Sequence, residues 1–408
     1  MSYQHYNMKL TTLSPIFIGD GKKLIKKEYI YDGENKKIII PDLFKMMDYF
    51  EMYRMNGEYE IYMSTKKNEI NLGEWIKNKR GNLKMVSNFT KYVIDFKNAG
   101  PRDAKGKFDL NEISTFIKDP YGLPYIPGSS IKGMIRTALL CYEIVNNDKL
   151  SNLLSQIYEK SKDYDSKPNF YKKNMSFTTS KLEKEVFSTI LKEKPKLPDA
   201  LRSNMRGLII GDSRPLKTSD LTLSKKIDYT IGKNENLLPI YRESIKPEVD
   251  IYFDISIDSL VDNTAFPYSM ANIFEAVNLF NQTSNKYFYS IFDRENKGEN
   301  IVYLGGGTGF LSKTMIYPAF AKSQTYLKNL YKDLDISKDE AEIRYRDEKI
   351  SKAVEVTHRI FKRTLNEKVY YEHNHDIDLL DEVSPHTCKC TRYNGKLYNM
   401  GICKLDYA

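Results

Sequence analysis

Residues 125–140 decide the fold, and they read Tyr125-Ile126-Pro127-Gly128-Ser129-Ser130-Ile131-Lys132-Gly133-Met134-Ile135-Arg136-Thr137-Ala138-Leu139-Leu140. The stretch opens with a proline-glycine turn, and two hydroxyl residues follow that can cap the first turn of a helix. After them, apolar residues recur at spacings of three and four, which is typical of one buried helix face. The stretch therefore predicts an amphipathic helix whose apolar face consists of Ile131, Met134, Ile135, Ala138 and Leu139.

The polar side of this predicted helix carries a candidate anion site. Lys132 and Arg136 are four residues apart, so their side chains project together from the first turns. The unpaired amides of the first turn, with Ser129 and Ser130, would face the same spot. In a basic chain the expected anion is a phosphate. An ordinary amphipathic helix with two cations on its exposed side fits the same residues, so both interpretations stay open.

Length and charge narrow the class of protein. The 408 residues exceed one ordinary domain, so two domains are expected. The 63 Lys and Arg outnumber the 54 Asp and Glu, which gives a net charge of +9 and permits contact with a polyanion. The 31 Tyr and 19 Phe would suit base stacking on single-stranded RNA, although most of them are expected in the core.

The same composition predicts a cytoplasmic protein. The sequence has no run of about eighteen uncharged apolar residues, so no membrane-spanning helix is expected. Its N-terminus lacks the apolar core of a signal peptide. The four Cys do not form a disulfide framework, which agrees with a reducing compartment.

The order of predicted elements indicates an α+β fold. A strand over residues 8–18 runs into a Gly19-Asp20-Gly21 turn, a hairpin surrounds residues 32–35, and Asp42 caps a helix. This order predicts two ferredoxin-like domains of the RRM type. The first covers residues 1–200, with insertions at about 56–120 and 147–200. The second covers residues 201–408, includes an alternating strand over 249–258 and contains a glycine-rich loop.

The glycine-rich loop follows a predicted strand and is a second candidate phosphate site. Its backbone amides could approach a phosphate closely because four of its five residues are glycines. Neither a Walker A motif nor a dinucleotide fingerprint fits the spacing. A tight turn between a strand and a helix is the alternative. If the loop binds RNA, the contacts come from Gly305, Gly306, Gly307, Thr308, Gly309 and Lys313.

The C-terminal region gives only a weak indication of zinc. His373, His375 and His386 lie near Cys388, Cys390 and Cys403, but a second closely spaced cysteine pair is missing. On a strand, the two cysteines would share one face as small core residues. We therefore expect no metal site and no cofactor. A zinc- or nucleotide-dependent enzyme remains the alternative from another class.

The segment from Pro127 to Leu139 resembles the signature of the RAMP superfamily, the RNA-binding proteins of type III CRISPR effector complexes. The resemblance continues through residues 13–21, 238–243 and 305–309 and through Ser384-Pro385-His386. It implies the subunit that caps the backbone of a type III-A (Csm) complex at the 3′ end of the CRISPR RNA (crRNA). The implied partners are crRNA, the other Csm subunits, above all the repeated backbone RAMP subunit, and host trimming nucleases.

One departure from the family concerns catalysis. Many RAMP relatives carry a His where this chain has Phe17, and a Phe cannot move protons. The resemblance therefore implies a subunit that assists crRNA maturation without catalysing it. Asp20 is the weak catalytic candidate, although aspartate in such a turn usually serves the turn itself. A RAMP endoribonuclease that processes crRNA is the alternative function.

Overall fold

The computed structural model describes most of the chain. It covers residues 3–65, 70–96, 100, 104–147, 149–150, 153, 183–188, 202–258, 266–309, 312, 314–315, 317–318 and 385–408. Lys313, most of the predicted insertion at 147–200, Ser384, His373 and His375 lie outside these residues.

One antiparallel sheet draws its strands from the whole length of the chain. Its strands lie in the order β11-β14-β1-β10-β7. The alternating sequence of β10 explains its place, because Ile251, Phe253, Ile255 and Ile257 are buried while the residues between them are exposed or half-buried. The strand predicted over 249–258 is thereby confirmed. The bounds of the five strands are β1 (Tyr3–Thr12), β7 (Leu208–Ile210), β10 (Asp250–Asp258), β11 (Ile301–Tyr303) and β14 (Ile402–Tyr407).

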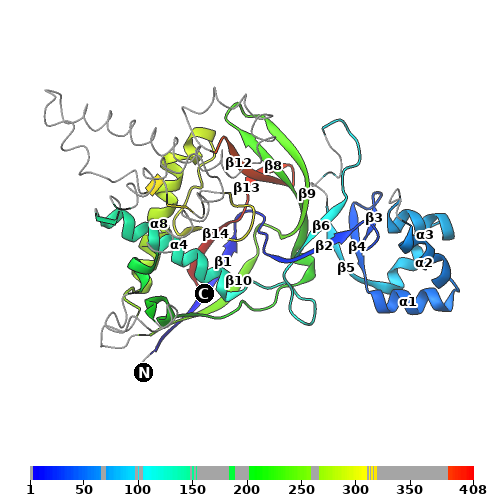
Figure 1. The fold of residues 1–408 in the computed structure, drawn as a ribbon, viewed down its shortest axis with the longest axis horizontal. Helices are drawn as coiled ribbons and strands as arrows, with labels where there is room; N and C mark the ends of the chain where they lie inside the picture. The colour runs from blue at the N-terminus through cyan, green and yellow to red at the C-terminus, as the bar shows by residue number, and fades with distance from the viewer. Residues whose placement is uncertain are drawn as a thin grey trace, which may run out of the picture.

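Two long helices pack against each other beside this sheet (Figure 1). They are α4 (Gly128–Asn146) and α8 (Met270–Tyr287). In chain order, β1, α4, β7, β10, α8 and β14 follow a β-α-β-β-α-β pattern, and β11 is an additional edge strand. This is the pattern of one ferredoxin-like unit. The predicted signature helix is confirmed, with Ile131, Ile135 and Leu139 fully buried.

A second sheet has a different order, β2-β6-β9-β8-β5-β4-β3, and β12 pairs with β8 and β13. The pairs β5–β8 and β6–β9 are parallel, and the others are antiparallel. The hairpin predicted around residues 32–35 is confirmed as β3 and β4. The strands are β2 (Gly19–Ile25), β3 (Ile30–Asp32), β4 (Lys37–Pro41), β5 (Thr90–Asp95), β6 (Glu112–Phe116), β8 (Leu221–Thr230), β9 (Glu235–Ile245), β12 (Thr387–Tyr393) and β13 (Lys396–Asn399).

Three short helices between β4 and β5 form a separate end of the molecule, far from α4 and α8 (Figure 1). As predicted, Asp42 caps the first helix, and its carboxylate accepts a hydrogen bond from the Lys45 amide. A second apolar core holds the helices together around Phe50, Trp75 and Phe89. The helices are α1 (Leu43–Met52), α2 (Asn56–Ser64) and α3 (Leu72–Arg80). The described residues also form the 3-10 turns η1 (Lys84–Phe89), η3 (Asn204–Gly207), η4 (Thr218–Asp220) and η5 (Tyr289–Phe292). We call residues 42–89 the helical insertion.

The architecture is therefore mixed α and β, as predicted, but one point differs from the sequence interpretation. Among the described residues of 56–120, the helical part ends at Phe89, and β5 and β6 of the second sheet follow it. The domain boundary at residue 200 stays a prediction; β1 pairs with β10 and β6 with β9, so both sheets contain strands from either side of it. Among the described helices, none is both long and apolar enough to cross a membrane.

Candidate nucleic-acid interface

The glycine loop packs tightly against Phe17, in the segment between β1 and β2. Gly305 has a φ of +85°, and a Cβ at this position would lie 2.2 Å from the Phe17 carbonyl oxygen. The Gly306 amide donates a hydrogen bond of 2.7 Å to the same oxygen. Only glycine permits this approach, because any side chain would collide with backbone.

Hydroxyl groups inside the loop complete its shape. Thr308 is 5% exposed, and its Oγ1 donates to the Gly305 carbonyl at 3.2 Å and lies 2.6 Å from Ser312 Oγ. Ser312 Oγ in turn donates to the Gly309 carbonyl at 2.9 Å. The loop is therefore a preformed structure, and its glycine residues are half-buried rather than covered.

A guanidinium group lies directly beside the loop. Arg242, on β9, stands over the Phe17 ring at 5.2 Å, and its Nη1 lies 3.6 Å from Met400 Sδ. A Cβ at Gly307 would lie 2.6 Å from the same nitrogen, so the loop backbone and the guanidinium are neighbours. Burial lowers the pKa of Arg242, and the carboxylate of Asp228 partly opposes this effect.

Two lysines form ion pairs with Asp228, the carboxylate that also acts electrostatically on Arg242. Asp228 lies 2.9 Å from the Lys389 ammonium and 3.6 Å from that of Lys226. Burial lowers the pKa of Lys226, and so does the nearby charge of Lys389. Three cations around a single carboxylate leave this surface positive. We call Lys226, Arg242, Lys389 and the residues 305–309 the loop-cation site.

Sequence reasoning predicted the loop but not its cations. Lys226, Arg242 and Lys389 lie on β8, β9 and β12, and only strand pairing brings them together. The resemblance of residues 238–243 to the family was the one available signal, because that segment contains Arg242.

The start of α4 differs from the prediction. Neither Ser129 nor Ser130 caps the helix by its side chain; the N-cap position is Pro127. Instead, the Gly128 amide donates a hydrogen bond of 2.8 Å to Asp212 Oδ1, from the loop after β7. A carboxylate of the chain therefore lies at the helix start, where a phosphate was predicted.

The two cations of α4 lie on one side of the helix, as predicted. Arg136 forms an ion pair of 2.6 Å with Glu183 and stands over the Phe187 ring at 5.5 Å. Lys132 is half-buried, and its pKa is lowered by burial and by the charge of Arg136. Since α4 starts beside β7 and the glycine loop follows β11, the two predicted phosphate sites lie at opposite edges of the first sheet.

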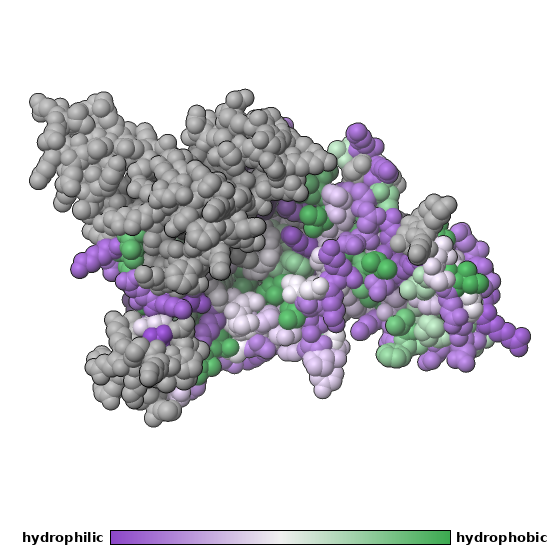
Figure 2. All heavy atoms as spheres, viewed as in Figure 1, coloured by the Kyte–Doolittle hydropathy of each residue, from purple (hydrophilic) through white to green (hydrophobic). Residues whose placement is uncertain are grey.

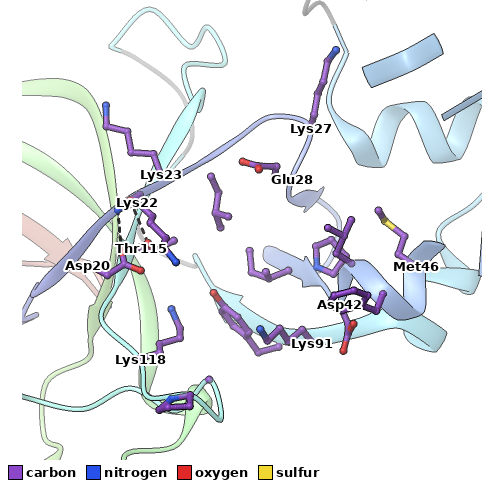
Figure 3. A pocket seen from close by; sticks show the side chains of 18 of the residues that line it. Asp20, Lys22, Lys23, Lys27, Glu28, Asp42, Met46, Lys91, Thr115 and Lys118 are labelled. Carbon is purple, nitrogen blue, oxygen red and sulfur yellow. Dashed lines mark hydrogen bonds between the residues drawn. The ribbon is translucent and has the colours of Figure 1, made fainter. Parts of the chain in front are cut away.

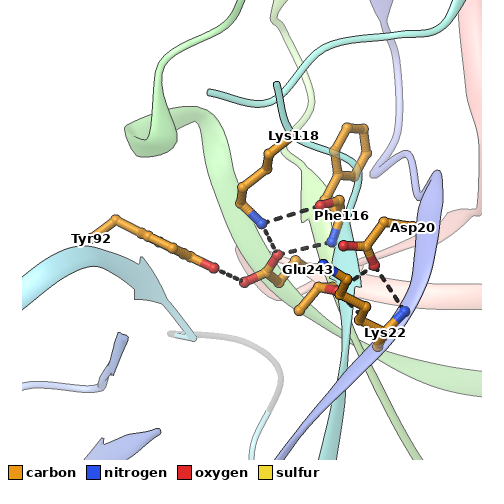
Figure 4. A network of polar contacts seen from close by, with 7 residues as sticks. Asp20, Lys22, Tyr92, Phe116, Lys118 and Glu243 are labelled. Atoms are coloured by element: carbon orange, nitrogen blue, oxygen red, sulfur yellow. Dashed lines mark hydrogen bonds and ion pairs between the residues drawn. The ribbon is translucent and has the colours of Figure 1, made fainter. Parts of the chain in front are cut away.

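Asp20 lies in strand β2, and its carboxylate is hydrogen-bonded to neighbouring residues. Residues 19–21 begin β2, where the pairing with β6 is irregular, so the predicted Gly-Asp-Gly turn is wrong. The Asp20 carboxylate accepts hydrogen bonds from the Lys22 amide at 3.0 Å and from Thr115 Oγ1 (Figure 4). These contacts hold the bulge together.

Behind Asp20, a buried carboxylate joins three strands (Figure 4). Glu243 is fully buried, and its oxygens accept from Tyr92 Oη at 2.6 Å and from the Phe116 amide at 2.8 Å. Lys118 completes the set as an ion-pair partner and also donates to the Phe116 carbonyl at 3.2 Å. Burial and the charge of Glu243 raise the pKa of Tyr92, which therefore stays a hydrogen-bond donor.

The cysteines of β12 behave as predicted for core residues. Cys388 and Cys390 share a buried face, and both Sγ atoms contact Asn399 Oδ1. Among the residues that the structure describes, no three His, Cys, Asp or Glu side chains are grouped so that they could hold a metal ion.

Comparison with known proteins identifies the class. Residues 9–312 match the RAMP superfamily, so the chain belongs to this superfamily. Its relatives include the CRISPR system Cms protein Csm5 of Streptococcus thermophilus, which is 29% identical over 78% of this chain and 82% of that protein. Csm5 of Mycobacterium tuberculosis is 25% identical over 76% of this chain and 83% of the relative.

Solved structures share the fold. One is a chain of a Csm–crRNA–target RNA ternary complex from a type III-A CRISPR-Cas system, with a TM-score of 0.58 and 20% identity over 99% of this chain and 100% of that chain. Another is T. onnurineus Csm5, with a TM-score of 0.53 and 20% identity over 76% of this chain and 92% of that one.

Proposed function

We propose that the chain is a non-catalytic, RNA-binding subunit of a type III-A CRISPR ribonucleoprotein. Membership of the RAMP superfamily and relatives named Csm5 support this assignment. In the proposal the chain binds crRNA near its 3′ end, caps the filament of repeated backbone subunits and assists crRNA maturation. Its partners are crRNA, the other Csm subunits and host trimming nucleases.

The loop-cation site is the observation that carries the RNA-binding part of the proposal. Half-buried glycine amides beside three cations and one carboxylate suit a phosphodiester backbone, which needs close approach and positive charge. Gly305, Gly306, Gly307, Thr308 and Gly309 belong to this contact, and Lys313, which was predicted with them, lies outside the described residues. In the proposal, Ser129, Ser130, Lys132 and Arg136 form a second contact at the other edge of the sheet.

Lys226→Ala combined with Arg242→Ala should weaken RNA binding similarly for all sequences. Contacts to phosphates position a strand without reading its bases. For single strands, each lost phosphate contact changes the log–log salt slope by about 0.7, so the slope should become shallower by about 1.4. Fluorescence anisotropy with a labelled RNA at several salt concentrations measures the slope.

Lys77→Ala with Lys79→Ala is the matched control, because it removes two exposed charges from α3. Its slope should stay close to that of the parent. The double variant Lys132→Ala with Arg136→Ala tests the second contact by the same measurement. Its salt slope should also become shallower by about 1.4. A folded Lys226/Arg242 variant with the parent's slope would rule out the loop-cation site.

Deletion of the gene should leave complexes with longer crRNA or without their 3′-proximal end. A filament built from heterologous contacts stays open until a distinct subunit ends it. Sequencing of the RNA in tagged complexes from a deletion strain measures guide length. Guides of mature length in intact particles would contradict the capping role.

The purified protein should not cleave RNA with or without Mg²⁺. Phe17 cannot serve as an acid or a base, and the Asp20 carboxylate is engaged by Lys22 and Thr115. Incubation with labelled repeat RNA, followed by gel electrophoresis, checks this expectation. Specific cleavage that disappears in Asp20→Ala would favour the endoribonuclease instead.

A further inference from the structure

A cavity of about 880 Å³ separates the helical insertion from the second sheet (Figure 3). Its polar wall comes from β2, β5, β6 and the turn after β6, whereas its apolar wall comes from α1 and α2. None of its lining residues belongs to the loop-cation site or to α4. The cavity is therefore a feature that the proposed RNA contacts do not use.

The carboxylates of the cavity are already occupied by local structure. Asp20 holds the bulge of β2, and Asp42 caps α1. Glu28 accepts from the Ile25 amide at 2.9 Å. Asp119 accepts from two amides of its own turn at 2.8 and 2.9 Å. These hydrogen bonds fix the four carboxylates in the walls, and within the described part of the chain none of them forms an ion pair with Lys22 or Lys91.

The five lysines of the cavity differ from one another. Lys27 donates to three carbonyl groups at the end of α2, Lys118 is paired with Glu243, and Lys23 is paired with Glu112 at 2.7 Å. Lys22 and Lys91 are exposed, and within the described part of the chain neither forms an ion pair. Both point into the cavity (Figure 3), so two ammonium groups can pair with an anionic ligand there.

The opposite wall is unusually apolar for an accessible surface. Phe44 is 84% exposed, and Leu43 and Met63 beside it are 57% and 41% exposed. Figure 2 shows hydrophobic patches among polar residues at this end of the molecule. An exposed aromatic ring and two ammonium groups that line the same cavity provide both elements of a single-strand site, namely a stacking platform and phosphate contacts.

We infer that this cavity binds a segment of single-stranded RNA, with a base stacked on Phe44 and the backbone held by Lys22 and Lys91. The inference rests on the proposed RNA-binding function and adds a second, separate contact. The presence of an exposed ring and ammonium groups in one cavity favours RNA over an acidic protein segment, because a nucleotide joins a flat apolar base to a phosphate.

Variants of Phe44 distinguish stacking from simple apolar contact. Phe44→Leu keeps apolar bulk but removes the ring, and it should weaken binding of the full-length protein to a labelled oligouridylate about tenfold. Phe44→Trp should restore the affinity. Because Phe44 is largely exposed, neither change should alter folding. With 4-thiouridine in the oligonucleotide, ultraviolet crosslinks should map to the peptide that contains Phe44.

Lys22→Ala with Lys91→Ala should make the salt slope shallower by about 1.4, while the Lys77/Lys79 control should leave it unchanged. Unchanged RNA affinity in the cavity variants, together with loss in the Lys226/Arg242 variant, would overturn the inference and leave the proposed function intact. Cavity variants that bind RNA normally but no longer join the other subunits would show a protein-docking surface instead. Failure of the parent protein to bind the oligouridylate would overturn both proposals.

Discussion

Glu243→Ala should lower the free energy of unfolding by about 3–5 kcal/mol. The substitution removes the acceptor of Tyr92 Oη and of the Phe116 amide, and it leaves the Lys118 ammonium without its carboxylate. Lys118 is only 14% exposed, so water cannot fully replace the lost partner. The three contacts join β5, β6 and β9, and their loss weakens the attachment of the helical insertion to the second sheet.

Urea denaturation followed by circular dichroism measures this change. Glu112→Ala is the matched control, because Glu112 pairs with Lys23 at the surface, where both side chains are more than half exposed. Such a pair contributes about 0–1 kcal/mol. If Glu243→Ala unfolds at the same urea concentration as the control, the buried network does not stabilise the fold.

Gly128→Ala should destabilise the protein by about 1–3 kcal/mol, although alanine is normally the better helix residue. A Cβ at this position would lie 2.2 Å from the Ile210 carbonyl oxygen and 2.8 Å from that of Gly211. Both atoms belong to backbone at the end of β7, so relief requires a shift of the helix or of the strand. The hydrogen bond to Asp212 would lengthen as a result.

Gly133 provides the control within the same helix. It is exposed, and no atom lies within 4 Å of the Cβ that an alanine would add. Gly133→Ala should therefore raise the free energy of unfolding by about 0.5–1 kcal/mol. Equal effects of the two substitutions in thermal or urea denaturation would contradict the close approach at Gly128.

The sequence predicted those elements whose signals are local. The apolar spacing of α4, the alternation of β10 and the cap at Asp42 each depend on residues within one or two turns or one strand. Asp212 could not be predicted as the partner of Gly128, because 84 residues separate them. The serines at the expected cap positions led to a wrong prediction, because the tertiary hydrogen bond from Gly128 to Asp212 replaces a local side-chain cap.

In the candidate site, too, the part with a local sequence signal was predicted and the part that depends on distant contacts was not. Four glycines in five residues identify the loop directly, but the reason for Gly305 is the Phe17 carbonyl, which is nearly 300 residues away. The cations on β8, β9 and β12 have no common sequence pattern. Their grouping depends on strand pairing, which in turn depends on the complete sheet.

The position of β1 between β10 and β14 has a consequence for synthesis of the chain. Ile402 donates its amide to Ser14 Oγ across 388 residues, and β14 pairs with β1 over a similar separation. At about 5–20 residues per second, a ribosome needs about 20–80 s between these segments. During that time one side of β1 has no ladder partner, and such an edge can pair with another nascent chain. The central strand of the sheet is therefore completed only after β14 has emerged, so chaperone capacity and growth temperature should influence the yield of folded protein.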